Sequence, residues 1–202
     1  MHRSDEQIKS SGREQVIKYL TEGTSSGGIE HASQEEVEDK LRAYFAEMKD
    51  DLEQGNSGSF VRTLKTSMGV ALAGAHKATV IFLTTGTSSE GIGNSPNPDA
   101  VAGDLSAHFQ EIRGALDMED NNTAVNRIEA ALGVCLAGDR IPTVQFLTED
   151  TESEGIEFED VAKIKGQLSY YFSEMTRNLE ESDSASFTNN MQIALGVALA
   201  AK

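Results

Sequence analysis

One short apolar stretch occurs three times along this chain, and its recurrence constrains the fold more than any other feature. It reads SMGVALAG, ALGVCLAG and ALGVALAA at residues 67–74, 131–138 and 194–201. Other landmarks return at the same distance, since Leu20 to Leu83 is 63 residues and Leu83 to Leu147 is 64. A fixed internal period is the signature of a repeated structural unit. The sequence therefore predicts three tandem copies of one ~63-residue unit.

The period also gives the expected boundaries. We expect a flexible leader at 1–13, followed by copies at 14–76, 77–139 and 140–202 within one domain. The period and the three-element unit do not match the tetratricopeptide, ankyrin or armadillo signatures.

The middle element of each copy is predicted to be a long amphipathic helix. In the first copy, apolar residues recur every three or four positions from Val37 to Leu52, which places them on one helical face. Ser33 with Glu36, and Pro98 after Asn97, are typical of helix starts. The stripe predicts six buried residues: Leu41, Phe45, Leu105, Phe109, Leu168 and Phe172.

The last element of each copy is predicted to be a second helix, antiparallel to the first. Only short polar turns at 54–57, 120–122 and 182–184 separate the two. Glycine and alanine recur four residues apart in this element, as at Gly133 and Ala137. Glycine inside a helix costs about 1 kcal/mol relative to alanine, so its recurrence indicates close packing against another backbone.

The first element, at 16–21, 79–84 and 143–148, has two interpretations. The β-branched second version resembles a strand. However, Lys18 and Gln145 occupy the position of Ile81, whereas a buried parallel strand is apolar on both faces. We therefore expect a short helix and an all-α fold. The alternative is an α/β fold of β-α-α repeats with a small parallel sheet.

Composition narrows the function classes. The chain has 33 acidic and 17 basic residues, a formal charge of −16, and no basic patch, which disfavours nucleic acid and anionic membranes as partners. The single cysteine, Cys135, excludes an intramolecular disulfide, and it occupies the position of Ala71 and Ala198. The N-terminus lacks the apolar core of a signal peptide, so a soluble, cytoplasmic protein is expected.

A recurrent Thr-x-Ser-x-Gly-Ile loop supplies one set of candidate ligand-binding residues. Hydroxyls and glycine amides can hold an anion or phosphate, although the same residues also form ordinary turns. The candidates are Thr24, Ser26, Gly28, Thr87, Ser89, Gly91, Thr151, Ser153 and Gly155.

A recurrent glutamate supplies the second set. Glu47, Glu111 and Glu174 each follow the stripe phenylalanine by two residues, which by default points them to solvent. If the copies close around a pseudo-threefold axis, these carboxylates could meet and hold a hard cation. The histidines have no metal-ligand spacing on a helix.

The sequence shows no nucleophile or acid–base constellation and no cofactor motif. The expected function is therefore that of a non-enzymatic structural or protein-binding repeat protein. The alternative is a protein that binds a small ligand or cation through the recurrent loops or glutamates. Either the first element closes the set of copies, giving a monomer, or the chain forms a homo-oligomer.

Overall fold

The computed structural model describes residues 11–201, and these residues contain α-helices, short 3-10 helices and no β-strand. The expected all-α class is confirmed, and the α/β alternative with a small parallel sheet is wrong. In chain order the elements are α1 (Gly12–Thr21), η1 (Ile29–His31), α2 (Gln34–Glu53), α3 (Ser57–Ala73), α4 (His76–Thr84), η2 (Ile92–Asn94), α5 (Pro98–Asp117), α6 (Asn121–Ala137), α7 (Arg140–Thr148), η3 (Ile156–Phe158), α8 (Val161–Glu180) and α9 (Ser184–Leu199).

Packing explains why the β-branched segment is the helix α4. Val80 and Leu83, three residues apart, are buried, whereas Ile81 between them is 53% exposed. The position shared by Lys18, Ile81 and Gln145 thus faces outward, which is why it tolerates such different side chains. Thr84 donates its hydroxyl to the carbonyl of Val80 (2.8 Å), a local bond that suits threonine to a helix end.

Helix α1 begins before the expected end of the leader at residue 13. Ser11 caps α1 by accepting a hydrogen bond from the Glu14 amide (3.2 Å), and the helix begins at Gly12 rather than after residue 13. The remainder of the predicted leader, residues 1–10, lies outside the described residues. The other predicted starts are confirmed, because Ser33 caps α2 and Pro98 occupies the first turn of α5.

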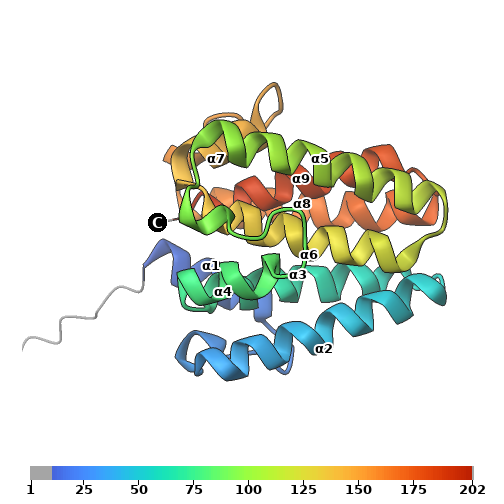
Figure 1. The fold of residues 1–202 in the computed structure, drawn as a ribbon, viewed down its shortest axis with the longest axis horizontal. Coiled ribbons are helices and arrows are strands. Elements are labelled where there is room, and N and C mark those ends of the chain that lie inside the picture. The colour runs from blue at the N-terminus through green and yellow to red at the C-terminus, as the bar shows by residue number, and fades with distance from the viewer. Residues whose placement is uncertain (1–10, 202) are drawn as a thin grey trace, which may run out of the picture.

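The long helices form three antiparallel pairs, α2–α3, α5–α6 and α8–α9 (Figure 1). The short helices α1, α4 and α7 pack on α3, α6 and α9 respectively. Contacts also join the pairs: α2 packs on α6 and α4, α5 on α9 and α7, and α8 on α3 and α1. The last third of the chain therefore packs directly against the first.

Helix α7 covers the end of α9. Val197 and Ala200 are buried, and α7 rather than α1 packs against α9. Two arginines bond carbonyls at the C-terminal ends of α3 and α9, since Arg13 donates to Leu72 O (2.6 Å) and Arg140 donates to Ala200 O (2.6 Å). Closure thus occurs through α8 against α1 and α3, not through α1 covering α9.

All six residues predicted from the amphipathic stripe are buried, as expected: Leu41, Phe45, Leu105, Phe109, Leu168 and Phe172. Cys135 is also buried, among apolar side chains of α3, α6 and α9 that include Ala71 and Ala198. Burial raises the pKa of the Cys135 thiol, so it behaves as a small apolar residue.

Glu129 lies half-buried on α6, the helix against which α2 packs. Burial raises the pKa of its carboxyl from 4.5 to about 7, although Lys49 of α2 opposes this shift. The folded state therefore binds a proton that the unfolded state has released between pH 4.5 and 7. In that window this group makes the free energy of unfolding fall as the pH rises.

We predict that Glu129→Gln removes this penalty. The variant should match the wild type near pH 4.5 and exceed its unfolding free energy by roughly 1–2 kcal/mol at pH 8, because solvent screens part of the effect. Gln192 occupies the corresponding position of α9, 63 residues on, so glutamine suits this site. Urea denaturation at both pH values measures the difference. Equal stability at pH 8 would contradict the assignment.

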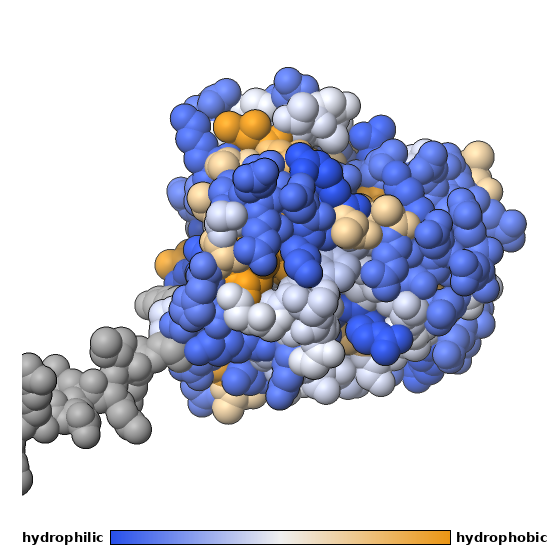
Figure 2. Space-filling model, turned by 90° about the horizontal axis from the view of Figure 1, so that it is seen from below, coloured by the Kyte–Doolittle hydropathy of each residue, from blue (hydrophilic) through white to orange (hydrophobic). Residues whose placement is uncertain are grey.

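The surface seen in Figure 2 is largely hydrophilic, with small separate hydrophobic spots and no continuous apolar face. The large apolar side chains that are exposed come from different elements: Ile81, Met118, Ile141, Phe158 and Tyr170. Within residues 11–201, none of the helices combines the length and the apolar character that crossing a membrane requires.

Candidate functional site

The recurrent loops are tight turns whose polar groups bond within the fold. Each threonine, Thr24, Thr87 and Thr151, donates its hydroxyl to the last-turn carbonyl of the preceding short helix (2.6–2.7 Å). The same oxygen accepts the amide of the loop serine two residues on (3.1 Å). The threonines thus close the ends of α1, α4 and α7, which satisfies carbonyls that would otherwise lack a partner.

The loop serines are buried against the following long helix. Ser26 bonds the Tyr44 hydroxyl (2.6 Å), and Ser153 bonds the Tyr171 hydroxyl (2.8 Å). Gly28, Gly91 and Gly155 follow with φ near 85°, a conformation that favours glycine, and they start the 3-10 helices. The geometry is that of a structural turn, and the serine hydroxyls do not face solvent.

The middle loop contains a serine–histidine–aspartate group that sequence spacing did not reveal. Ser89 donates to Asp104 Oδ2 (2.6 Å) and lies 2.7 Å from His108 Nε2. Because its single proton is used on Asp104, the serine oxygen accepts from Nε2–H, which leaves Nδ1 of His108 buried without a partner in the described residues. A nucleophilic serine needs the opposite arrangement of hydrogen bonds. The histidine accepts the serine proton at Nε2, and the aspartate accepts a hydrogen bond from Nδ1–H.

Two residues of this group are almost fully buried. Ser89 and His108 are 3% and 1% exposed. Desolvation, followed by the charge of Arg127, lowers the pKa of His108, which favours the neutral form of the ring. His108 occupies the place of Tyr44 and Tyr171, which bond the other loop serines.

The recurrent glutamates do not meet. Glu47 accepts a hydrogen bond from Thr63 (3.2 Å), Glu111 pairs with Arg127, and Glu174 pairs with Arg177 (2.5 Å). Within residues 11–201, one group of three acidic or histidine side chains has its ligand atoms within 4.8 Å of one another. None of the recurrent glutamates belongs to that group.

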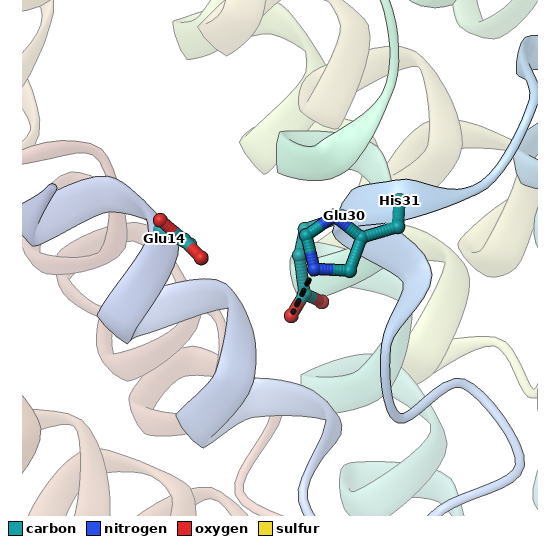
Figure 3. Close-up of side chains that lie close together, drawn as sticks. All are labelled: Glu14, Glu30 and His31. Atoms are coloured by element: carbon teal, nitrogen blue, oxygen red, sulfur yellow. Dashed lines mark ion pairs between the residues drawn. The ribbon is translucent and has the colours of Figure 1, made fainter. Parts of the chain in front are cut away.

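That group is Glu14, Glu30 and His31 (Figure 3). Figure 3 shows Glu14 of α1 facing Glu30 and His31 of η1 across a gap. Lys18 Nζ lies 3.2 Å from Glu14 Oε1 and 4.0 Å from Glu30 Oε1, so an ammonium group already supplies positive charge there. In the last third of the chain, Gln145 donates to Glu157 in the same way (3.1 Å), which indicates a structural link between short helix and 3-10 helix.

A different feature has the character of a binding site: an acidic cavity of about 270 Å³ between the α2–α3, α5–α6 and α8–α9 turns. These turns lie together at one end of the long helices (Figure 1). Four carboxylates line the cavity, from Asp51, Asp117, Glu119 and Asp183, and its described lining includes no lysine or arginine. We call this feature the turn cavity.

Asp51 is the least exposed of these carboxylates. It is 8% exposed, and its Oδ2 is buried with no hydrogen-bond partner in the described residues. A buried carboxylate without a partner is costly unless a positive group compensates it. The other lining carboxylates have more solvent or other bonds: Ser184 donates to Asp117, while hydrogen bonds from Ser186 lower the pKa of Asp183.

Helices α5 and α8 carry uncharged residues at the position that corresponds to Asp51. Sequence spacings of 64 and 63 residues align Asp51 with Ala115 and Asn178. Asn178 is buried, but Asn190 of α9 donates to its Oδ1 (2.8 Å). The residue aligned with Asn190 in the first third is Thr63, whose hydroxyl is directed to Glu47 instead. Asp51 therefore lacks the partner that makes Asn178 a satisfied core residue.

No protein-family model, curated protein or solved structure matches this chain. The assignment of a function therefore starts from the geometry of the turn cavity.

Proposed function

We propose that this chain is a non-enzymatic binding protein that holds a cationic group in the turn cavity. The observation that carries the proposal is the Asp51 carboxylate, buried at the cavity wall with one oxygen unpartnered and three further carboxylates around it. A cation would offset the cost of that buried charge and would be favoured by the negative field of the surrounding groups.

The proposal selects the second of the two functions expected from sequence, and moves its site. The recurrent loops bond internally, and the recurrent glutamates lie apart, whereas the turn cavity gathers acidic groups from three separate turns. A basic segment of a protein partner would supply such a cation. The hydrogen bonds of Ser89, which donates to Asp104 rather than to His108, favour binding over catalysis.

We also infer that residues 14–76, 77–139 and 140–202 are three copies of one unit closed around an approximate threefold axis. The cyclic order of contacts supports this, because α2, α5 and α8 each pack on the short helix and final helix of another pair. The turn cavity then lies at one end of the axis, where all three turns contribute. Closure favours a monomer, and the strongly acidic composition fits a soluble, cytoplasmic protein.

Asp51→Asn tests the proposal without threatening the fold, since asparagine occupies the aligned position at Asn178. We predict that the variant is more stable than the wild type by about 1 kcal/mol without ligand, because it removes an uncompensated buried charge. It should also lose the rise in melting temperature that bound cations give the wild type. Melting curves with CaCl₂, MgCl₂ and alkylammonium chlorides, at one constant ionic strength, measure both effects.

Asp50→Asn is the matched control, since it removes the same charge from the adjacent, exposed position of α2. It should retain the full cation-dependent rise. General screening of a chain with charge −16 would raise the melting temperature of both variants equally, and that result would contradict the proposed function.

A further inference from the structure

We propose that the cation held in the turn cavity is a primary ammonium group at the end of an aliphatic chain, as in a linear diamine or a lysine side chain. This inference rests on the proposed function and specifies its ligand class. Three features of the cavity carry it: the spacing of the carboxylates, the apolar surface between them, and the difference in burial between Asp51 and the other acidic groups.

Among the described residues, no three of the cavity carboxylates bring their oxygens within 4.8 Å of one another. A hard cation such as Ca²⁺ takes several oxygen ligands at about 2.3–2.6 Å, so ligand oxygens around one ion lie close to one another. Within the described chain, the group of three acidic or histidine ligands that converges to 4.8 Å is Glu14, Glu30 and His31, away from this cavity. The turn cavity instead distributes negative charge over its wall, which suits an extended cation.

Three leucines provide the apolar part of the wall. Leu52, Leu116 and Leu179 lie near the C-terminal ends of α2, α5 and α8 respectively, and all three line the cavity half-buried. Met118, which follows the lining residue Asp117, is 80% exposed. A metal ion gains nothing from such a surface, whereas methylene groups do gain from covering it.

The acidic groups of the cavity differ in how deeply they are buried. Asp51 is almost fully buried, whereas Asp117 and Glu119 are exposed. An ammonium group on Asp51, with its methylene chain against the leucines, would place a second positive group near the exposed carboxylates. The charge of Arg113 contributes to the lowered pKa of Asp183, after the hydrogen bonds from Ser186.

Isothermal titration calorimetry of the full chain at constant ionic strength and pH 7 tests the inference. The probes are methylammonium, pentylammonium, 1,5-diaminopentane, neutral pentanol, CaCl₂, MgCl₂ and Nα-acetyl-lysine amide. We expect one site per chain, with pentylammonium and diaminopentane binding about tenfold or more tighter than methylammonium, because the added methylene groups are buried. Pentanol should show no binding.

Asp51→Asn and Leu116→Ala separate the effect of charge from that of apolar contact, with Asp50→Asn as the control. Asp51→Asn should weaken diaminopentane binding by about tenfold or more, whereas Asp50→Asn should leave it unchanged. Leu116→Ala should reduce the advantage of pentylammonium over methylammonium without affecting methylammonium itself. Binding of the lysine amide as tight as that of diaminopentane would assign the site to a lysine side chain, and weaker binding would assign it to a free diamine.

The outcomes separate this inference from the function on which it rests. Asp51-dependent binding of Ca²⁺ or Mg²⁺, with no preference for alkyl chains, would overturn the ammonium assignment and leave a cation-binding protein. Absence of any Asp51-dependent binding would overturn both.

Discussion

Phe109→Ala should lower the free energy of unfolding by about 3–5 kcal/mol, the cost typical of removing a large buried aromatic side chain. Phe109 lies on α5 and is 6% exposed, within the continuous apolar core. The loss combines the transfer of apolar surface with the cavity that remains when the neighbours relax only partly. Urea denaturation monitored by circular dichroism measures the change.

Met118→Ala provides the comparison, because Met118 is a large apolar residue that is 80% exposed just after the same helix. Its replacement should change stability by no more than about 0.5 kcal/mol. A loss below about 1 kcal/mol for Phe109→Ala would mean that the α5 stripe does not form the core.

Gly133→Ala should destabilise the protein by about 1–3 kcal/mol, although alanine is the better helix former. A Cβ on Gly133 of α6 would lie 2.7 Å from Thr84 Cγ2 and 2.8 Å from Leu83 Cβ. These atoms sit close to the backbone of α4, so the clash is relieved only by moving one helix away from the other. Gly69 and Gly196 make the same close approach to α1 and α7.

Gly103→Ala is the matched control for this prediction. Gly103 is also a helical glycine, in α5, but a Cβ there would meet no atom within 4 Å. Alanine should therefore stabilise this position by up to about 1 kcal/mol. If Gly133→Ala also stabilises the protein, the close approach of α4 to α6 is wrong.

The sequence predicted the long helices because their signals are local. The stripe through Leu105 and Phe109 follows the helical period, and caps such as Ser33 mark the helix starts, so neither depends on distant contacts. The short helices were ambiguous because Val80 and Ile81 have strand propensity, and the outcome depends on packing of α4 against α6. The route of closure was also not predictable, since the contacts of α8 with α1 and α3 span most of the chain.

The candidate site was harder to predict than the fold. Thr24 and Ser26 recur in the sequence, and in the structure their hydroxyls bond within the fold, so recurrence alone did not separate a structural turn from a binding loop. Asp51 differs from the recurrent residues because it does not recur. It is a carboxylate near a core stripe, at a position where the aligned residues are Ala115 and Asn178. Only the fold shows that three separate turns bring Asp117, Glu119 and Asp183 beside it.

Methyl NMR spectroscopy tests the central claim, that the turn cavity binds a cation, most directly. With ¹³C-labelled leucine methyl groups, a titration with 1,5-diaminopentane, repeated with CaCl₂, reports each leucine separately. Leu52, Leu116 and Leu179 line the cavity, whereas Leu20, Leu83 and Leu147 are buried residues of the short helices α1, α4 and α7 and serve as internal controls. The account predicts saturable shifts of the first three with diaminopentane, absent in Asp51→Asn, and no change in the controls. It is contradicted if neither cation moves the cavity leucines, or if the shifts persist unchanged in Asp51→Asn.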